Sequence, residues 1–336
     1  MSEPSTPRAT IRQVIRGEPA ARPLLVPVIF ALGSRLENVS FREYLLNPTK
    51  IANALRQILA KFMLDGVAVY FDPLLEAEIL GCGREWRDER SCDPVGPFLS
   101  NVGELREKIA EISDISNRKP LATACDVLQR LKTMLNKEAA FLVRITGPVS
   151  LATQLVGSEA ASEEAAECAV EVTSAVTRAL LEAGANVVQV VEPELFRIPQ
   201  ARYGWWASLV APVINLVQFY EALPLIRSGA PGSTEHTLAS VLTESWSGTW
   251  SPVIADDSDR WAAWALHGVR PSLAMDAELK QRAAGVDIET RITELLGREA
   301  PLVLTTQEDV DADADVKVLA TWLGKVREAA WASARV

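Results

Sequence analysis

Eight short apolar runs recur along the 336-residue chain, and helix-like segments separate them. Each run is almost continuously apolar, which is typical of parallel strands that helices cover. Strand and helix in alternation predict a parallel α/β fold, and eight repeats favour a (β/α)₈ barrel over an open doubly wound sheet. The expected strands are Leu24–Leu32, Val67–Asp72, Ala140–Thr146, Val187–Glu192, Leu223–Gly229, Pro252–Asp256, Val269–Met275 and Pro301–Thr305.

The segments between these runs carry apolar residues at helical spacing. A glycine, Gly184, follows the third of them, and glycine just past a helix is a common end signal. Two further helices open with acidic residues, which suit a helix N-terminus. The expected helices are Phe41–Leu64, Ala122–Leu135, Glu163–Glu182, Asp276–Leu296 and Asp313–Ala332.

No stretch in the middle of the chain has the composition of a linker. The sequence therefore predicts one TIM-type barrel domain over residues 1–336, with an N-terminal helical extension whose first eight residues are flexible. The segment Pro73–Asn117 is a long insertion after the second strand. Long connections in compact domains are often functional, and this one falls on the face of the barrel where active sites lie.

Charge and composition exclude several classes of protein. Asp and Glu number 44 against 34 Lys and Arg, a net charge of −10, which disfavours non-specific binding to nucleic acid or anionic membranes. The four cysteines form no CxxC pair, so we expect reduced thiols. No apolar run reaches the ~20 residues that cross a bilayer, and no signal peptide is visible, so we expect a cytoplasmic protein.

Carboxylates gather where the expected strands end. Asp72 ends an almost wholly apolar strand, Glu76 follows it closely, and Glu192 ends the fourth strand. Asp256 and Asp276 stand at the ends of the sixth and seventh. In a barrel these positions share one face, where carboxylates in a partly dry site can act as acid, base or metal ligand. The alternative for the helix-preceding acids is that they cap those helices.

Common cofactor motifs are absent. The sequence has no GxxxxGK[ST], no GxGxxG after a strand and no HExxH. Its only histidines are His236 and His267, so a multi-histidine metal site is impossible. The function must therefore be read from the strand ends.

Several segments, in order along most of the chain, resemble the uroporphyrinogen decarboxylase superfamily. They match the opening helix of that family, the strand that delivers its catalytic aspartate, and its Gly-Pro-Phe-Thr-Leu-Ala turn. The matching segments are Arg8–Pro19, Val67–Asp72, Gly147–Ala152, Gly184–Glu192 and Asp276–Leu279.

This resemblance implies a (β/α)₈ barrel and one of two chemistries. One branch decarboxylates uroporphyrinogen without a cofactor, and the other comprises methyltransferases that exchange a methyl group with a corrinoid, usually with zinc activating a thiol. The run Asp72–Glu78 followed by Leu80-Gly81-Cys82 looks closer to the methyltransferase branch.

The chain departs from both branches at their functional motifs. Where decarboxylases carry Arg-Gln-Ala-Gly-Arg, it has Phe30–Ser34, with Arg35 one position late, and the Gly-His after strand eight is missing. Where methyltransferases carry His-x-Cys-Gly, it has Ile226–Gly229, so both zinc ligands are lost. Glu76, Glu192 and Asp256 could form a carboxylate substitute, which would favour a harder metal than zinc.

Three functions follow from the resemblance. The first is a methyltransferase-like enzyme that acts with a corrinoid or another tetrapyrrole and has a divergent or lost zinc site. The second is a decarboxylase of uroporphyrinogen or a related tetrapyrrole. The third is a barrel that binds a tetrapyrrole or partner without turnover. The expected partners are a tetrapyrrole or methyl donor, a separate corrinoid protein, and a second copy of the chain in a homodimer.

The candidate residues divide into two groups by role. In the first function Asp72 orients or protonates the reacting group, while Glu76 and Glu192 act as acid, base or ligand. The residues expected to bind substrate are Gly33, Arg35, Gly147, Tyr203, Arg227 and Asp276.

Overall fold

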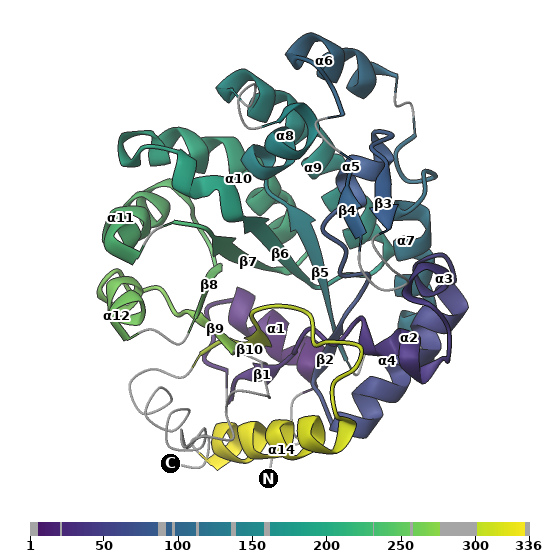
Figure 1. Ribbon diagram of the computed structural model, residues 1–336. Helices are drawn as coiled ribbons and strands as arrows, with labels where there is room; N and C mark the ends of the chain where they lie inside the picture. The colour runs from purple at the N-terminus through teal and green to yellow at the C-terminus, as the bar shows by residue number, and fades with distance from the viewer. Residues whose placement is uncertain are drawn as a thin grey trace.

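The computed structural model shows an eight-stranded parallel barrel, which confirms the predicted fold class (Figure 1). It describes residues 6–20, 22–86, 92–95, 98–111, 114–135, 139–157, 162–230, 232–255, 258–275 and 301–332. The order around the barrel is β1-β10-β9-β8-β7-β6-β5-β2. The strands are β1 (Leu24–Leu25), β2 (Gly66–Ala68), β5 (Ala140–Thr146), β6 (Val187–Glu192), β7 (Leu223–Ser228), β8 (Ser251–Ala255), β9 (Ser272–Met275) and β10 (Val303–Thr306).

Helices surround this sheet, and neighbouring helices pack against one another (Figure 1). They bury one apolar stripe each; in α4 it consists of Ile51, Leu55, Ile58 and Phe62, which recur at helical spacing. The predicted helix 276–296 lies outside the described residues. The outer helices are α4 (Pro48–Phe62), α7 (Leu121–Met134), α9 (Glu163–Ala183), α10 (Tyr203–Phe219), α11 (Glu235–Ser245), α12 (Ser258–Leu266) and α14 (Val316–Ala332).

Shorter elements complete the described chain. The N-terminal extension is a helix, as predicted, and several short helices follow strand ends. None of the described helices is long and apolar enough to span a membrane. These elements are α1 (Pro7–Ile15), α2 (Leu32–Leu36), α3 (Phe41–Leu45), α8 (Pro148–Val156), η1 (Pro193–Arg197), η2 (Gln200–Arg202) and η3 (Gly232–Thr234).

A single carboxylate joins the first strand to the second and so closes the barrel. The Asp65 N–H donates to the Leu25 carbonyl (3.0 Å), and the Leu25 N–H donates to Asp65 Oδ2 (2.9 Å). Arg22 holds the same carboxylate with two nitrogens, at 2.6 and 2.7 Å. Closure therefore rests on side-chain hydrogen bonds as well as backbone pairing.

Strands one and two are shorter than the sequence predicts. After β1, Pro27 has no N–H to give to a ladder, and the Val28 N–H donates to the side chain of Thr306 (3.0 Å) instead. After β2, Tyr70 adopts a left-handed conformation with φ of +50°, which no strand accommodates. Both strands therefore end early, and the segment after each of them turns across the barrel mouth.

The predicted helix Phe41–Leu64 is two helices, α3 and α4, and that expectation was wrong. Asn47 begins a new helix because its side-chain oxygen accepts the Lys50 N–H (3.1 Å). Pro48, in the first turn of α4, cannot continue α3 because it lacks an N–H.

The predicted insertion 73–117 contains its own secondary structure. It holds α5 (Leu75–Ile79), an antiparallel hairpin of β3 (Arg84–Trp86) and β4 (Cys92–Pro94), and α6 (Val102–Ala110). In Figure 1 these elements lie beside the end of the barrel at which β5 ends. The insertion therefore delivers side chains to the mouth from outside the eight repeats.

Candidate active site

Asp72 lies at the C-terminal end of the barrel, where the chain leaves β2. The residue is 5% exposed. One oxygen accepts the Leu74 N–H (3.1 Å), and the other accepts a hydrogen bond from Arg84 Nη2 (2.6 Å). The predicted catalytic aspartate is therefore buried and neutralised by a cation.

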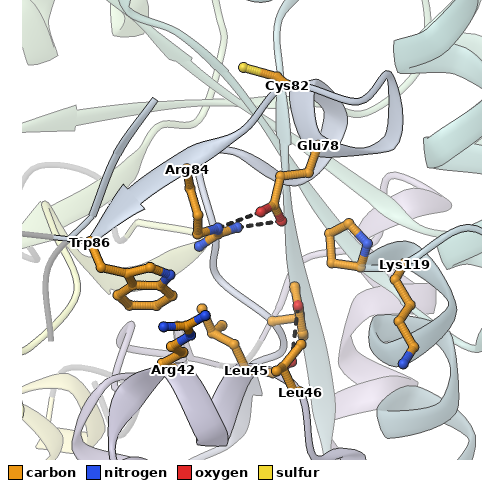
Figure 2. A pocket seen from close by; sticks show the side chains of 10 residues that line it. Arg42, Leu45, Leu46, Glu78, Cys82, Arg84, Trp86 and Lys119 are labelled. Carbon is orange, nitrogen blue, oxygen red and sulfur yellow. Dashed lines mark hydrogen bonds and ion pairs between the residues drawn. The ribbon is translucent and has the colours of Figure 1, made fainter. Parts of the chain in front are cut away.

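Arg84, the cation on β3, links Asp72 to a second carboxylate. Its Nε contacts Glu78 Oε1 at 2.5 Å, and Figure 2 shows the two side chains facing each other. Burial lowers the pKa of Arg84, but the hydrogen bonds and charges of Glu78 and Asp72 outweigh it and raise that pKa overall. Arg84 therefore stays charged.

Glu76 is a second buried carboxyl beside the mouth, on α5. It is 1% exposed, and its oxygens accept the Thr146 N–H (2.7 Å) and the Thr146 hydroxyl (2.9 Å). Burial raises the pKa of Glu76 to about 7, although the bonds from Thr146 oppose the shift. Near neutral pH this carboxyl can both give and take a proton.

Arg144 is the one charged residue of β5, and sequence reasoning missed it. Its guanidinium carbon lies 5.4 Å from the ring centroid of Phe71. Its charge interacts with Glu76, after the neighbouring strand β2, and with Glu308, after β10, which does not pair with β5, so the side chain lies inside the mouth. Burial lowers the pKa of Arg144.

Apart from the Phe71 ring, the guanidinium of Arg144 has no hydrogen-bond or ion-pair partner among the residues that the structure describes. Its Nε is buried without a hydrogen bond, and among the described residues no carboxylate forms an ion pair with it. A charged residue within an otherwise apolar strand was the signal that could have pointed to it in the sequence, because buried charges need a reason.

Two more buried polar atoms face the same interior. Strand pairing places Gln189 beside Arg144. When the register is followed from strand to strand, with side chains alternating between the two faces, Thr305 lies on the same face of the sheet as Arg144 and Gln189. Gln189 Oε1 and Thr305 Oγ1 are buried without hydrogen-bond partners. Buried polar groups are normally paired, so these atoms indicate a polar ligand or ordered water inside the barrel.

Glu192 points the other way. It follows Gln189 by three residues in β6, which places it on the outer face. It is fully buried and accepts hydrogen bonds from Ser150 (N–H 2.6 Å, and its hydroxyl), from the Val149 N–H (3.1 Å) and from Trp206 Nε1 (3.2 Å). Burial raises its pKa, and these donors oppose the shift. The structure does not bring Glu192 together with Asp72 and Glu76.

Two predicted binding glycines give room to neighbouring side chains. A Cβ on Gly147 would lie 2.3 Å from an oxygen of Glu192, and a Cβ on Gly33 would lie 2.1 Å from the Tyr44 hydroxyl oxygen. The observed contacts of both glycines are therefore packing contacts.

The predicted binding side chains are dispersed. Arg227, at the end of β7, is at the mouth and pairs with Glu308 (2.6 Å). Arg35 is exposed and donates to the Ala314 carbonyl (3.0 Å), in the segment that follows β10. Tyr203 is buried, and its hydroxyl shares a hydrogen bond with Thr234 (3.0 Å). Asp276 lies outside the described residues.

A metal site is not formed by the residues that the structure describes. Within them, no three His, Cys, Asp or Glu side chains cluster as metal ligands would. Glu76 and Glu192, proposed as ligands from the sequence, lie on different faces of the barrel wall, and Asp256 is outside the described part. The described residues therefore do not provide the ligand set that zinc requires.

Comparison with known proteins agrees with this architecture. A family model described as "Uroporphyrinogen decarboxylase (URO-D)" matches residues 6–203. No curated protein matches. A methyltransferase from Methanosarcina mazei has a similar structure, with a TM-score of 0.74 and 15% identity over 97% of this chain and 99% of that one. YagE from E. coli K12, of the dihydrodipicolinic acid synthase family, gives a TM-score of 0.44 and 12% identity over 94% and 79%.

Proposed function

The chain belongs to the uroporphyrinogen decarboxylase family, and from this premise we propose that it is a methyltransferase-like enzyme that takes a small carboxylate-bearing methyl donor into the barrel mouth. The reaction partner in this proposal is a corrinoid carried by a separate protein. The full-length likeness in fold to a methyltransferase supports the proposal, and the polar groups inside the mouth carry it.

The observation that carries the proposal is the unpaired guanidinium of Arg144. A buried guanidinium nitrogen without a hydrogen bond is costly, and a carboxylate is the group that relieves this cost through two parallel hydrogen bonds. Arg84 and Arg227 are already paired with carboxylates of the chain. One available guanidinium fits a substrate with one anionic group better than uroporphyrinogen, which has eight.

Glu76 supplies the proton that methyl transfer from a neutral donor requires. When the bond between the methyl carbon and its heteroatom breaks, the electron pair stays on the heteroatom, and a proton from the Glu76 carboxyl neutralises it. A pKa of about 7 keeps that proton available at neutral pH. Because the charges of Arg144 and Glu76 interact, the group that anchors the substrate lies beside the group that moves the proton.

No step of this proposal uses zinc, since the described residues do not fit it. The corrinoid, when presented at the mouth, would supply the centre that accepts the methyl group.

A decarboxylase is the second candidate, and the same pair of residues favours it. Loss of carbon dioxide from a pyrrole acetate needs an anchored anion and a proton for the carbon that is left, and no metal. Arg144 and Glu76 could provide both.

One experiment separates these functions. In one assay the full chain is mixed with a panel of methoxybenzoates and reduced cobalamin, and the formation of methylcobalamin is followed by absorbance. In a parallel assay the full chain is mixed with uroporphyrinogen, and the mass of the product is measured by mass spectrometry. We expect methylcobalamin with at least one methoxybenzoate, and loss of activity in Arg144→Gln and Glu76→Gln. Arg130→Gln, on the outer helix α7, is the matched control.

The other outcomes decide against this proposal. Loss of carbon dioxide from uroporphyrinogen supports the decarboxylase instead. Tight binding of a probe with no product supports a barrel that binds without turnover. Full activity in Arg144→Gln would remove the argument that this residue anchors the substrate.

A further inference from the structure

A pocket lies between α3 and the hairpin of the insertion. Figure 2 shows Arg42 and Trp86 at one side of it and Lys119 at the other, with Glu78 and Arg84 above. Its volume is about 400 Å³, which lies within the range of small-molecule sites. Asp72, Glu76 and Arg144 do not line this pocket, so it is distinct from the site described in the barrel mouth.

The cations of this pocket are not equivalent. Arg84 is committed to Asp72 and Glu78. Arg42 and Lys119 form no ion pair within the described residues, and the Arg42 guanidinium carbon lies 5.9 Å from the ring centroid of Trp86. Two cations without carboxylate partners therefore border one hollow and give it a positive rim.

Two apolar side chains of the pocket lining are incompletely covered. Leu46 is 61% exposed although it belongs to this lining, and Trp86 is only half-buried. A flat aromatic body could cover both, because offset stacking on an indole adds to the gain from removing apolar surface from water. Arginine beside an indole also suits an aromatic acid, since guanidinium groups pair with carboxylates and stack on rings.

We propose that this pocket is a second ligand site, which binds a flat aromatic carboxylate. The ring lies against Trp86 and Leu46, and the carboxylate lies between Arg42 and Lys119. The site is distinct from the proposed reaction site, because Arg144 and Glu76 do not line this pocket. Its occupant contacts Arg84, the residue that is paired with Asp72.

The test is isothermal titration calorimetry of the full chain with 2-naphthoate and with its neutral analogue, 2-naphthamide. We expect naphthoate to bind and naphthamide to bind about ten-fold more weakly, because only the acid pairs with the cations. The double variant Arg42→Gln with Lys119→Gln should weaken naphthoate by about ten-fold, the sum of two exposed charge contacts. Trp86→Leu should weaken both probes.

The controls keep the proposal falsifiable. Lys61→Gln, an exposed lysine on α4 outside the pocket, should bind naphthoate as the unaltered chain does. Arg144→Gln should also leave naphthoate binding unchanged. Equal affinity for acid and amide, no effect of the double variant, absence of binding at millimolar probe, or loss of binding only in Arg144→Gln would each overturn the second site. The last result would place the aromatic acid in the barrel mouth and leave the proposed function intact.

Discussion

Arg84 Nη2 and Asp72 Oδ2 lie 2.6 Å apart, so a residue of the inserted hairpin neutralises the aspartate that follows the second barrel strand. Their side chains are 9% and 4% exposed. A buried pair of this kind couples the insertion to the barrel mouth, since neither charge can be left alone there without cost.

Removal of Arg84 should therefore destabilise the fold strongly. We expect Arg84→Gln to lower the free energy of unfolding by about 3 kcal/mol, because it leaves the Asp72 carboxylate buried and unpaired. Urea unfolding of the full chain measures this. Adding Asp72→Asn should recover part of the loss. Arg42→Gln serves as the control, because Arg42 forms no ion pair with the residues that the structure describes. Equal stability of Arg84→Gln and the unaltered chain would show that this pair is unimportant.

Glu76 should make stability fall as the pH rises. Its pKa of about 7 in the folded protein lies above the ordinary 4.5 because burial disfavours the charged form. Between these values the folded state holds a proton that the unfolded chain has lost, so the free energy of unfolding decreases with pH, by about 3 kcal/mol across the window. The difference between unaltered chain and Glu76→Gln, measured by urea unfolding from pH 4 to pH 8, isolates this contribution.

Asp309 provides the internal comparison for that measurement. It accepts the Phe30 and Ala31 N–H groups, at 2.7 and 2.8 Å, and burial raises its pKa to about 7. In the unaltered chain both Glu76 and Asp309 therefore contribute to the decrease of the free energy of unfolding with pH. Glu76→Gln should remove only the part that comes from Glu76. A pH profile that Glu76→Gln does not change would contradict the raised pKa of Glu76.

Substitution of Glu192 tests whether this residue has a structural or a catalytic role. Each of the groups that contact its oxygens donates a hydrogen bond to them. In Glu192→Gln the amide NH₂ would point at one of these donors and could not accept its hydrogen bond. We expect the free energy of unfolding to fall by about 2 kcal/mol. The thermal unfolding midpoint and the activity should be measured together. Lost activity at unchanged stability would favour the catalytic role that the sequence predicts over the anchoring of α8 and α10 to β6.

Two glycines should respond in opposite directions to alanine. A Cβ on Gly229 would lie 1.9 Å from the Pro193 carbonyl oxygen, which is backbone and cannot move aside cheaply. We expect Gly229→Ala to cost about 3 kcal/mol, the upper part of the range for overpacking. A Cβ on Gly324, within α14, would meet nothing, so Gly324→Ala should stabilise by about 0.5–1 kcal/mol. Chemical unfolding of both variants checks the pair, and a neutral Gly229→Ala would show that the turn after β7 can shift.

The sequence by itself determined the barrel and where its chemistry should be sought. Eight apolar runs became eight parallel strands, because a strand covered by helices must be apolar along its length. Asp72 and Glu76 were placed at the mouth for the same reason, since parallel strands present their C-terminal ends on one face. Family membership also followed from the order of short segments.

Only the tertiary structure decided how those groups are partnered. Asp72 meets Arg84 because an inserted hairpin folds back over the mouth, and a contact of that kind has no periodicity to reveal it. Arg144 became a candidate only when the register placed it inside the barrel. Glu192 turned outward because alternation gives adjacent strand residues opposite faces, and the covering helices decide which face is interior. Sequence patterns fix which residues reach a strand end, whereas packing fixes what they face there.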